Sequence, residues 1–173
     1  NTPFEGHFDG NYANFKVDIK GNDYLGLFGY ISSESTLQNF SVTGNITGRN
    51  YLGGVAGFSA GSIQNVYSKV DITGNNNLGG ILGANNGYLE KFYATGNIIG
   101  DGSNHGGVIG YHSGTVLEGY FGGKIQGSIN VGGIIGFSTN QEIFNVYYNL
   151  TMIDFDILVD GKLKPIHAVS NMP

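Results

Sequence analysis

The 173-residue chain contains no cysteine, so disulfides and thiolate metal sites are excluded. Its 3 prolines are too few for its 31 glycines to belong to a collagen-like or disordered low-complexity chain. No apolar run approaches the ~20 residues of a membrane-spanning helix. A formal net charge of −5 gives no reason to expect a nucleic-acid partner. What remains is one domain of ordinary size whose glycines occupy specific positions.

Those glycines recur in similar segments. The segments are "YLGLFGYI" from Tyr24, "YLGGVAGF" from Tyr51, "NLGGILGA" from Asn77, "HGGVIGYH" from His105 and "VGGIIGFS" from Val131. The last glycine of each is separated from the next by 28, 26, 27 and 26 residues. Such a spacing indicates one supersecondary unit that is repeated along the chain.

Within each unit the apolar residues form short β-branched or aromatic runs, and none follows a helical period. The pattern predicts an all-β fold, a right-handed parallel β-helix (β-solenoid) of about five to six rungs, each rung being one repeat. The expected solenoid covers 1–157, and 158–173 form a C-terminal cap or the start of the next module, with a hairpin signal at Asp160-Gly161. The expected rungs are 4–23 (a lead-in), 24–50, 51–76, 77–104, 105–130 and 131–157.

Glycine allows positive φ or a close approach of backbones where a Cβ would collide with the next rung. Stacking therefore predicts two columns of structural glycines. The first is Gly26, Gly54, Gly80, Gly107 and Gly133, and the second is Gly29, Gly57, Gly83, Gly110 and Gly136. We expect Gly83→Val to destabilise the fold strongly and a change at nearby Asn85 to be mild.

Two apolar columns lie between these glycines. They are Leu27, Val55, Ile81, Val108 and Ile134, and Phe28, Ala56, Leu82, Ile109 and Ile135. Adjacent strand residues point to opposite faces, so one column is expected in the core and the other outside, as a surface for a protein contact. Two more columns are expected in the core: Leu37, Ile63, Leu89, Val116 and Ile143, and Ile46, Ile72, Ile98, Ile125 and Met152. A turn or solvent position is expected where Asn39, Asn65, Lys91, Glu118 and Asn145 align.

The repeats resemble the GLUG motif, named for a Gly-Leu-any-Gly core. "GLFG" at 26–29 matches this core, and "GVAG", "GILG", "GVIG" and "GIIG" match it with other aliphatic residues. The segment "FEGHFDGNYANFKV" resembles the lead-in that often precedes GLUG arrays, so the resemblance covers nearly the whole chain. These arrays occur in large secreted or wall-attached bacterial proteins, including zinc metallopeptidases of the immunoglobulin A peptidase family and adhesin-like proteins. The resemblance implies a secreted or cell-wall-attached bacterial setting and no catalytic residue in this segment, although the parent protein could be a zinc metallopeptidase.

The residues themselves offer no catalytic or metal site, and no cofactor is expected. An H-E-x-x-H zinc motif is absent, and we interpret the four dispersed histidines as surface or turn residues: His7, His105, His112 and His167. Polysaccharide lyases and hydrolases would require paired or clustered acids. The acids of this chain are scattered instead, and Asp71 aligns with Asn45, Asn97 and Lys124. Asp9 is expected to form a turn by bonding nearby backbone amides.

One candidate ligand-binding feature is a column of tyrosines with Ser41 at its start: Tyr67, Tyr93, Tyr120 and Tyr147. Stacked tyrosines stabilise a solenoid and could also bind a glycan. Because the chain begins at Asn1 without a signal sequence, we expect a piece of a longer protein. The prediction is a non-catalytic spacer, scaffold or adhesive module that contacts neighbouring domains, a host or surface protein, or a glycan. The alternative is a carbohydrate-binding or polysaccharide-cleaving β-helix.

Overall fold

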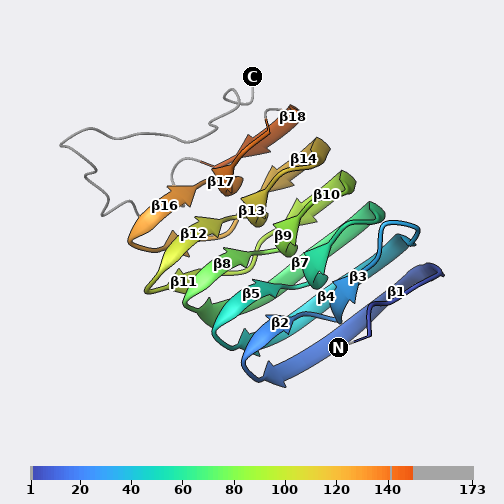
Figure 1. Cartoon of the computed structure of the whole chain (residues 1–173), viewed down its shortest axis with the longest axis horizontal. Coiled ribbons are helices and arrows are strands. Elements are labelled where there is room, and N and C mark those ends of the chain that lie inside the picture. Colours follow the sequence, from blue (N-terminus) through green and yellow to red (C-terminus); the bar gives the residue numbers. More distant parts are fainter. Residues whose placement is uncertain (1, 141, 150–173) are drawn as a thin grey trace.

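The computed structural model describes residues 2–140 and 142–149. Within these residues the chain has no helix, and its parallel strands wind into a β-solenoid of about five turns (Figure 1). The all-β, parallel prediction is therefore confirmed. Met152 and the expected cap at 158–173 lie outside the described residues. In the described part of the chain, no helix has the length and apolarity needed to cross a membrane.

Three parallel sheets form the sides of the rod. The long sheet contains β1 (His7–Lys20), β4 (Thr36–Thr47), β7 (Ser62–Gly74), β10 (Tyr88–Ala94), β11 (Ile98–Gly100), β14 (Thr115–Phe121), β15 (Ile125–Gln126) and β18 (Ile143–Tyr148). The second sheet contains β2 (Asp23–Leu25), β5 (Asn50–Gly53), β8 (Asn76–Gly79), β12 (Ser103–Gly106) and β16 (Ile129–Gly132). The third sheet contains β3 (Phe28–Ile31), β6 (Ala56–Ser59), β9 (Leu82–Asn85), β13 (Ile109–His112) and β17 (Ile135–Ser138).

The core lies between the three sheets and consists of stacked apolar columns. The column from Leu37 to Ile143 is at most 9% exposed, and Ile46, Ile72, Ile98 and Ile125 are fully buried. Strand register places equivalent residues side by side, for example Leu37 beside Ile63 and Ile46 beside Ile72. Both predicted core columns are confirmed as far as the structure describes them.

The predicted outward apolar column is wrong. Val55 and Ala56 are both fully buried, and so are their counterparts in the next three rungs. On the first rung Leu27 and Phe28 are partly buried and pack against the core. The strict alternation of a flat strand fails here because these residues lie where the chain passes from the second sheet into the third. Neighbouring residues on the two sides of this corner both point into the rod, so no exposed apolar stripe exists there for a protein partner.

The predicted glycines lie where rungs approach closely. A Cβ on Gly83 would be 2.5 Å from the carbonyl carbon of Tyr51 and 2.6 Å from the carbonyl oxygen of Gly57, both in the preceding rung. A Cβ on Gly29, which has no such rung beneath it, would meet only its own rung, 3.1 Å from the Tyr24 carbonyl oxygen. Among the described residues, the glycines with positive φ are Gly6 and Gly44, neither of them in these columns. Close approach is therefore the reason for glycine in the second column.

The first glycine column differs from the prediction at its start. Leu25 pairs with Leu52, so Gly26 occupies the position of Gly53 and not that of Gly54. The first rung is one residue shorter at this corner. The alignment of the repeats did not identify a further column of glycines that are in register: Gly53, Gly79, Gly106 and Gly132.

Two columns of non-glycine residues adopt the left-handed conformation. One runs along the long sheet with φ between 52° and 58°: Asn39, Asn65, Lys91, Glu118 and Asn145. Asn39 is partly exposed and the other four are exposed, as expected for a turn or solvent position. The other begins the corner segments: Tyr24, Tyr51, Asn77, Asn104 and Asn130. Here the amide of Asn104 donates to Asn77 and that of Asn130 donates to Asn104, each at 2.8 Å.

Aromatic rings close the N-terminal end of the core. The ring of Phe8 lies 5.4–5.7 Å from those of Phe15, Phe28 and Phe40, and Phe4 contacts Phe28 at 5.0 Å. Edge-to-face contacts of this kind stabilise beyond the area they bury. The lead-in segment thus caps the first complete rung, because its phenylalanines cover core residues that have no rung beneath them.

Candidate functional site

The tyrosine column lies in register on the long sheet. Ser41 pairs with Tyr67, Tyr67 with Tyr93, Tyr93 with Tyr120, and Tyr120 with Tyr147. The rings of Tyr67 and Tyr93 stack at 5.2 Å and 15°, and those of Tyr93 and Tyr120 stack at 5.4 Å and 18°. Burial, followed by the neighbouring Tyr120 and Tyr67, raises the pKa of the Tyr93 hydroxyl, so this hydroxyl is uncharged at neutral pH.

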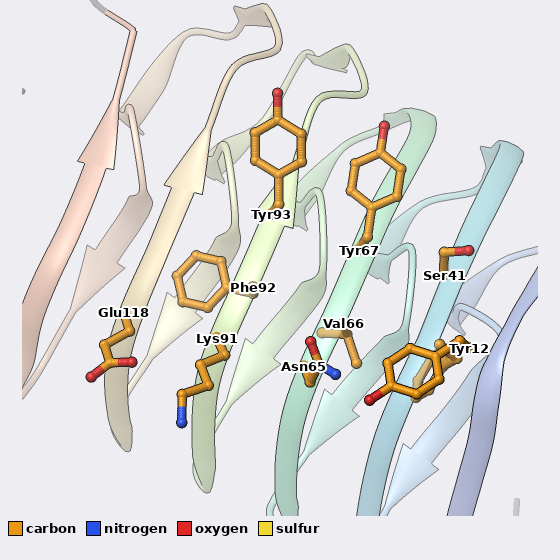
Figure 2. Close-up of a pocket in the computed structure, with 10 residues that line it drawn as sticks. Tyr12, Ser41, Asn65, Val66, Tyr67, Lys91, Phe92, Tyr93 and Glu118 are labelled. Atoms are coloured by element: carbon orange, nitrogen blue, oxygen red, sulfur yellow. The ribbon is translucent and has the colours of Figure 1, made fainter.

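The stacking leaves one face of Tyr67 uncovered. Tyr93 is stacked on both faces, by Tyr67 and by Tyr120, whereas Ser41 has no ring to cover the near face of Tyr67 (Figure 2). The Tyr67 hydroxyl is within hydrogen-bonding distance of Thr95 Oγ1 (3.1 Å), which holds the ring in place. The ladder therefore begins with a fixed aromatic face above a small polar residue.

A shallow groove of about 590 Å³ opens beside this face (Figure 2). Its lining residues come from successive rungs: Tyr12, Phe40, Ser41, Asn65, Val66, Tyr67, Lys91, Phe92, Tyr93 and Glu118. Three of them, Asn65, Lys91 and Glu118, belong to the left-handed column of the long sheet. The tyrosine column lies on the other side of the groove, and Phe40, Val66 and Phe92 lie between the two columns in the sequence.

Tyr12 lies at the lead-in end of the groove because β1 carries an irregularity. Asp9 pairs with Gln38 and Ala13 with Phe40, so residues 10–12 lie opposite the single residue Asn39. Asn11 and Tyr12 both have positive φ, and the Tyr12 side chain is 76% exposed. Figure 2 shows its ring extending over β4 toward Asn65. The prediction of a ladder site did not include Tyr12, although the extra residues in "FDGNYANF" were a detectable signal.

Asp9 holds this irregularity in place. Its carboxylate accepts hydrogen bonds from the backbone nitrogen of Asn11 (2.9 Å) and from the side-chain amides of Gln38 (2.9 Å) and Asn39 (3.2 Å). The bond from Asn11 is the largest cause that lowers the pKa of Asp9, followed by Gln38 and Asn39. The expected turn-forming role of Asp9 is confirmed.

The interpretation of the histidines as surface residues is wrong for His105 and His112, which are fully buried. His105 occupies a core column between Leu78 and Val131, and its Nε2 bonds the carbonyl of Asn75 (2.7 Å). Its Nδ1 is buried without a hydrogen-bond partner. Burial is the largest effect on His105 and lowers the pKa of its imidazole. His7 is exposed, and His167 lies outside the described residues.

Asn85 is also buried rather than peripheral. Its side-chain oxygen accepts from the backbone nitrogen of Gly87 (3.1 Å), and its nitrogen lies 3.4 Å from Nδ1 of His112. Asn85 is thus unsuitable as a mild comparison for Gly83.

The described residues that line the groove include one carboxylate, that of Glu118. Within the described residues, no group of three or more potential ligands from His, Asp and Glu could hold a metal ion. Asp71 pairs with Asn45 and accepts two hydrogen bonds from Asn97, one from its backbone nitrogen and one from its side chain. Asp18 pairs with Asn45 from the other side, so it lies two rungs away from Asp71. These two carboxylates are separated by an amide and are exposed to solvent.

Comparison with known proteins gives one partial similarity. A stretch of 67 residues is 42% identical to halomucin from Haloquadratum walsbyi (strain DSM 16790 / HBSQ001). This match covers 36% of the present chain and 1% of halomucin. The match thus spans about a hundredth of the length of that relative. No family model matches the chain, and no solved structure matches it. A β-solenoid fold is consistent with a repeat or scaffold module.

Proposed function

We propose that this chain is a non-catalytic repeat module of a larger secreted or surface-attached protein, where it acts as a spacer and as a scaffold for interaction. The observation that carries the proposal is the regular stacking itself. The rungs contact one another through closely approaching glycines, through apolar columns and through the asparagine ladder from Asn77 to Asn130. In repeat proteins such nearest-neighbour contacts build an extended rod of adjustable length.

The similarity to part of halomucin supports a long parent protein, and the resemblance to GLUG arrays supports a secreted or wall-attached bacterial setting. Cell fractionation of the source organism with an antibody against this segment tests the location. We expect the signal in the wall or culture fluid and accessible to protease on intact cells. A signal confined to the cytoplasmic fraction would contradict the proposed setting.

The competing function is cleavage of a polysaccharide. The purified chain should give no turnover of neutral or acidic polysaccharides in assays for reducing ends and for unsaturated products. Asp71→Asn is the matched variant, since Asp71 and Asp18 are acids of the same column, on either side of Asn45. Robust turnover that disappears in this variant, or in another single carboxylate variant, would establish an enzyme instead.

A further inference from the structure

The groove beside the tyrosine ladder has the size and lining of a binding site. Its volume of about 590 Å³ falls within the roughly 300–1,000 Å³ of small-molecule sites. From Ser41 to Tyr93 it crosses two strand spacings, roughly 10 Å, which is comparable with the length of a disaccharide. Because the groove runs across strands of successive rungs, it follows the rod axis and suits an extended chain molecule.

The aromatic wall limits where a ligand can stack. Two tyrosines of the column line the groove, Tyr67 and Tyr93. Tyr93 is stacked on both faces, by Tyr67 and Tyr120, and Tyr67 is stacked on the face toward Tyr93, so these faces are closed to a ligand. The exception is the face of Tyr67 above Ser41, since serine leaves the space of one ring unfilled. A flat ligand ring placed there would continue the ladder by one step.

The opposite wall supplies hydrogen-bonding groups of both kinds. The Asn65 amide is exposed while its nitrogen donates to Asn39 (2.8 Å), so its oxygen remains available as an acceptor. The Lys91 side chain is 60% exposed, and its ammonium lies 3.4 Å from the carboxylate of Glu90. Lys91 and Glu118 are the charged residues among the ten that line the groove, and their charges are opposite. Such a wall suits an uncharged ligand with many hydroxyl groups better than a polyanion or a polycation.

The backbone at the lead-in end adds an independent indication. Single left-handed residues recur along the solenoid, among them Tyr24 and Tyr51, whereas Asn11 and Tyr12 adopt positive φ in succession. Strained backbone of this kind must be held by the surrounding structure and is common at ligand sites. Here the Asp9 bonds hold the irregularity, which places a largely exposed ring at the end of the groove.

We propose that this groove binds a neutral oligosaccharide, with one sugar ring packed on the free face of Tyr67 above Ser41. The sugar hydroxyls bond the Asn65 amide and the Lys91 ammonium, and Tyr12 covers the end of the bound chain. This site goes beyond the proposed spacer role and does not depend on it.

The test is saturation-transfer NMR and calorimetry on the whole purified chain with cellohexaose, mannohexaose and maltohexaose, and with a galacturonic acid hexamer as the acidic comparison. We expect one or more of the neutral probes to bind. Tyr67→Ala should weaken binding about tenfold, the scale of one lost aromatic contact. Ser41→Tyr is the sharper variant, because it adds a ring in register and fills the proposed subsite while extending the ladder.

Tyr111→Ala is the matched control, since Tyr111 stacks on Phe137 (5.7 Å) on the third sheet, away from the groove. Its binding should equal that of the unmodified chain. Circular dichroism of each variant establishes that the solenoid is intact. The proposal is overturned if none of the neutral probes binds, if only the acidic hexamer binds, or if the folded Ser41→Tyr variant binds as well as the original. None of these results would affect the proposed spacer role.

Discussion

At the scale of single residues, His105 is the clearest departure from its column. The equivalent positions in neighbouring rungs are Leu52, Leu78 and Val131, all buried. The imidazole replaces these apolar side chains with a group whose Nδ1 is buried without a partner. Leaving a buried polar atom unsatisfied costs roughly 1–3 kcal/mol. His105 therefore makes its rung less stable than an apolar residue at the same position would.

We predict that His105→Leu stabilises the fold by about 1 kcal/mol at neutral pH. The Asn75 carbonyl keeps a partner in the variant, because the backbone nitrogen of Gly102 also donates to it (3.1 Å). Burial lowers the pKa of His105 in the folded chain, so the unfolded chain binds more protons below pH ~6.5. The free energy of unfolding should therefore fall as the pH drops below ~6.5, and less steeply in the variant. Denaturant unfolding between pH 5 and 8 measures both effects, and identical pH profiles would contradict the prediction.

The contact of Gly83 with the preceding rung gives a second prediction at this scale. Gly83→Ala should destabilise the fold by about 3 kcal/mol, because its Cβ would lie 2.5 Å from the backbone of Tyr51. Gly29→Ala is the control in the same column and should cost about 1 kcal/mol, since its nearest atom is 3.1 Å away. Thermal unfolding compares the two variants. Equal losses would mean that backbone approach between rungs does not explain the glycine column.

At the scale of elements, the repeat period and the core columns could be predicted because stacking imposes the same demand on every rung. The position of the corner could not be predicted, since the alternation of inward and outward residues does not indicate where one strand ends and the next sheet begins. Val55 and Ala56 point the same way for that reason. The left-handed column was only partly visible, because Asn39 and Asn65 suit positive φ whereas Lys91 and Glu118 carry no such signal. In the candidate site, the register of the tyrosines could be predicted from the sequence. The groove and the position of Tyr12 could not, because they depend on residues with positive φ and on the irregularity of β1.

The aromatic cap on β1 and β4 is the element on which the first rung depends. Phe40 is 3% exposed and contacts the rings of Phe8 and Phe15. We predict that Phe40→Ala costs about 3–5 kcal/mol, as for other buried phenylalanines. Removing Tyr12, which is exposed, should cost less than about 0.5 kcal/mol. Denaturant unfolding of both variants measures the costs, and a similar loss in the two would show that the cap does not act through its ring cluster.

At the scale of the whole molecule, the rungs are interchangeable in geometry although their sequences differ. Asn50 pairs with Asn76, so deleting residues 51–76 joins two equivalent corners and removes one rung. We expect the shortened chain to keep an all-β circular dichroism spectrum with reduced stability, because stability in such arrays is a sum over neighbours. Deleting 51–63 instead breaks the register and should prevent folding. A folded half-rung deletion, or an unfolded full-rung deletion, would contradict a solenoid of equivalent rungs.

The direction of the strand pairing has a mechanical consequence. The backbone hydrogen bonds between rungs run along the rod axis, and β1 and β18 lie at its opposite ends (Figure 1). Tension along the axis therefore separates one rung interface at a time. Each rung of 26–28 residues occupies about 4.8 Å of the folded rod and releases roughly 90 Å of extended chain. Optical tweezers should record lengthening in steps of about that size, and a single all-or-none extension would contradict it. A chain built of such modules would lengthen under load and return when released, so in the proposed spacer role it would be a reserve of length rather than a stiff tether.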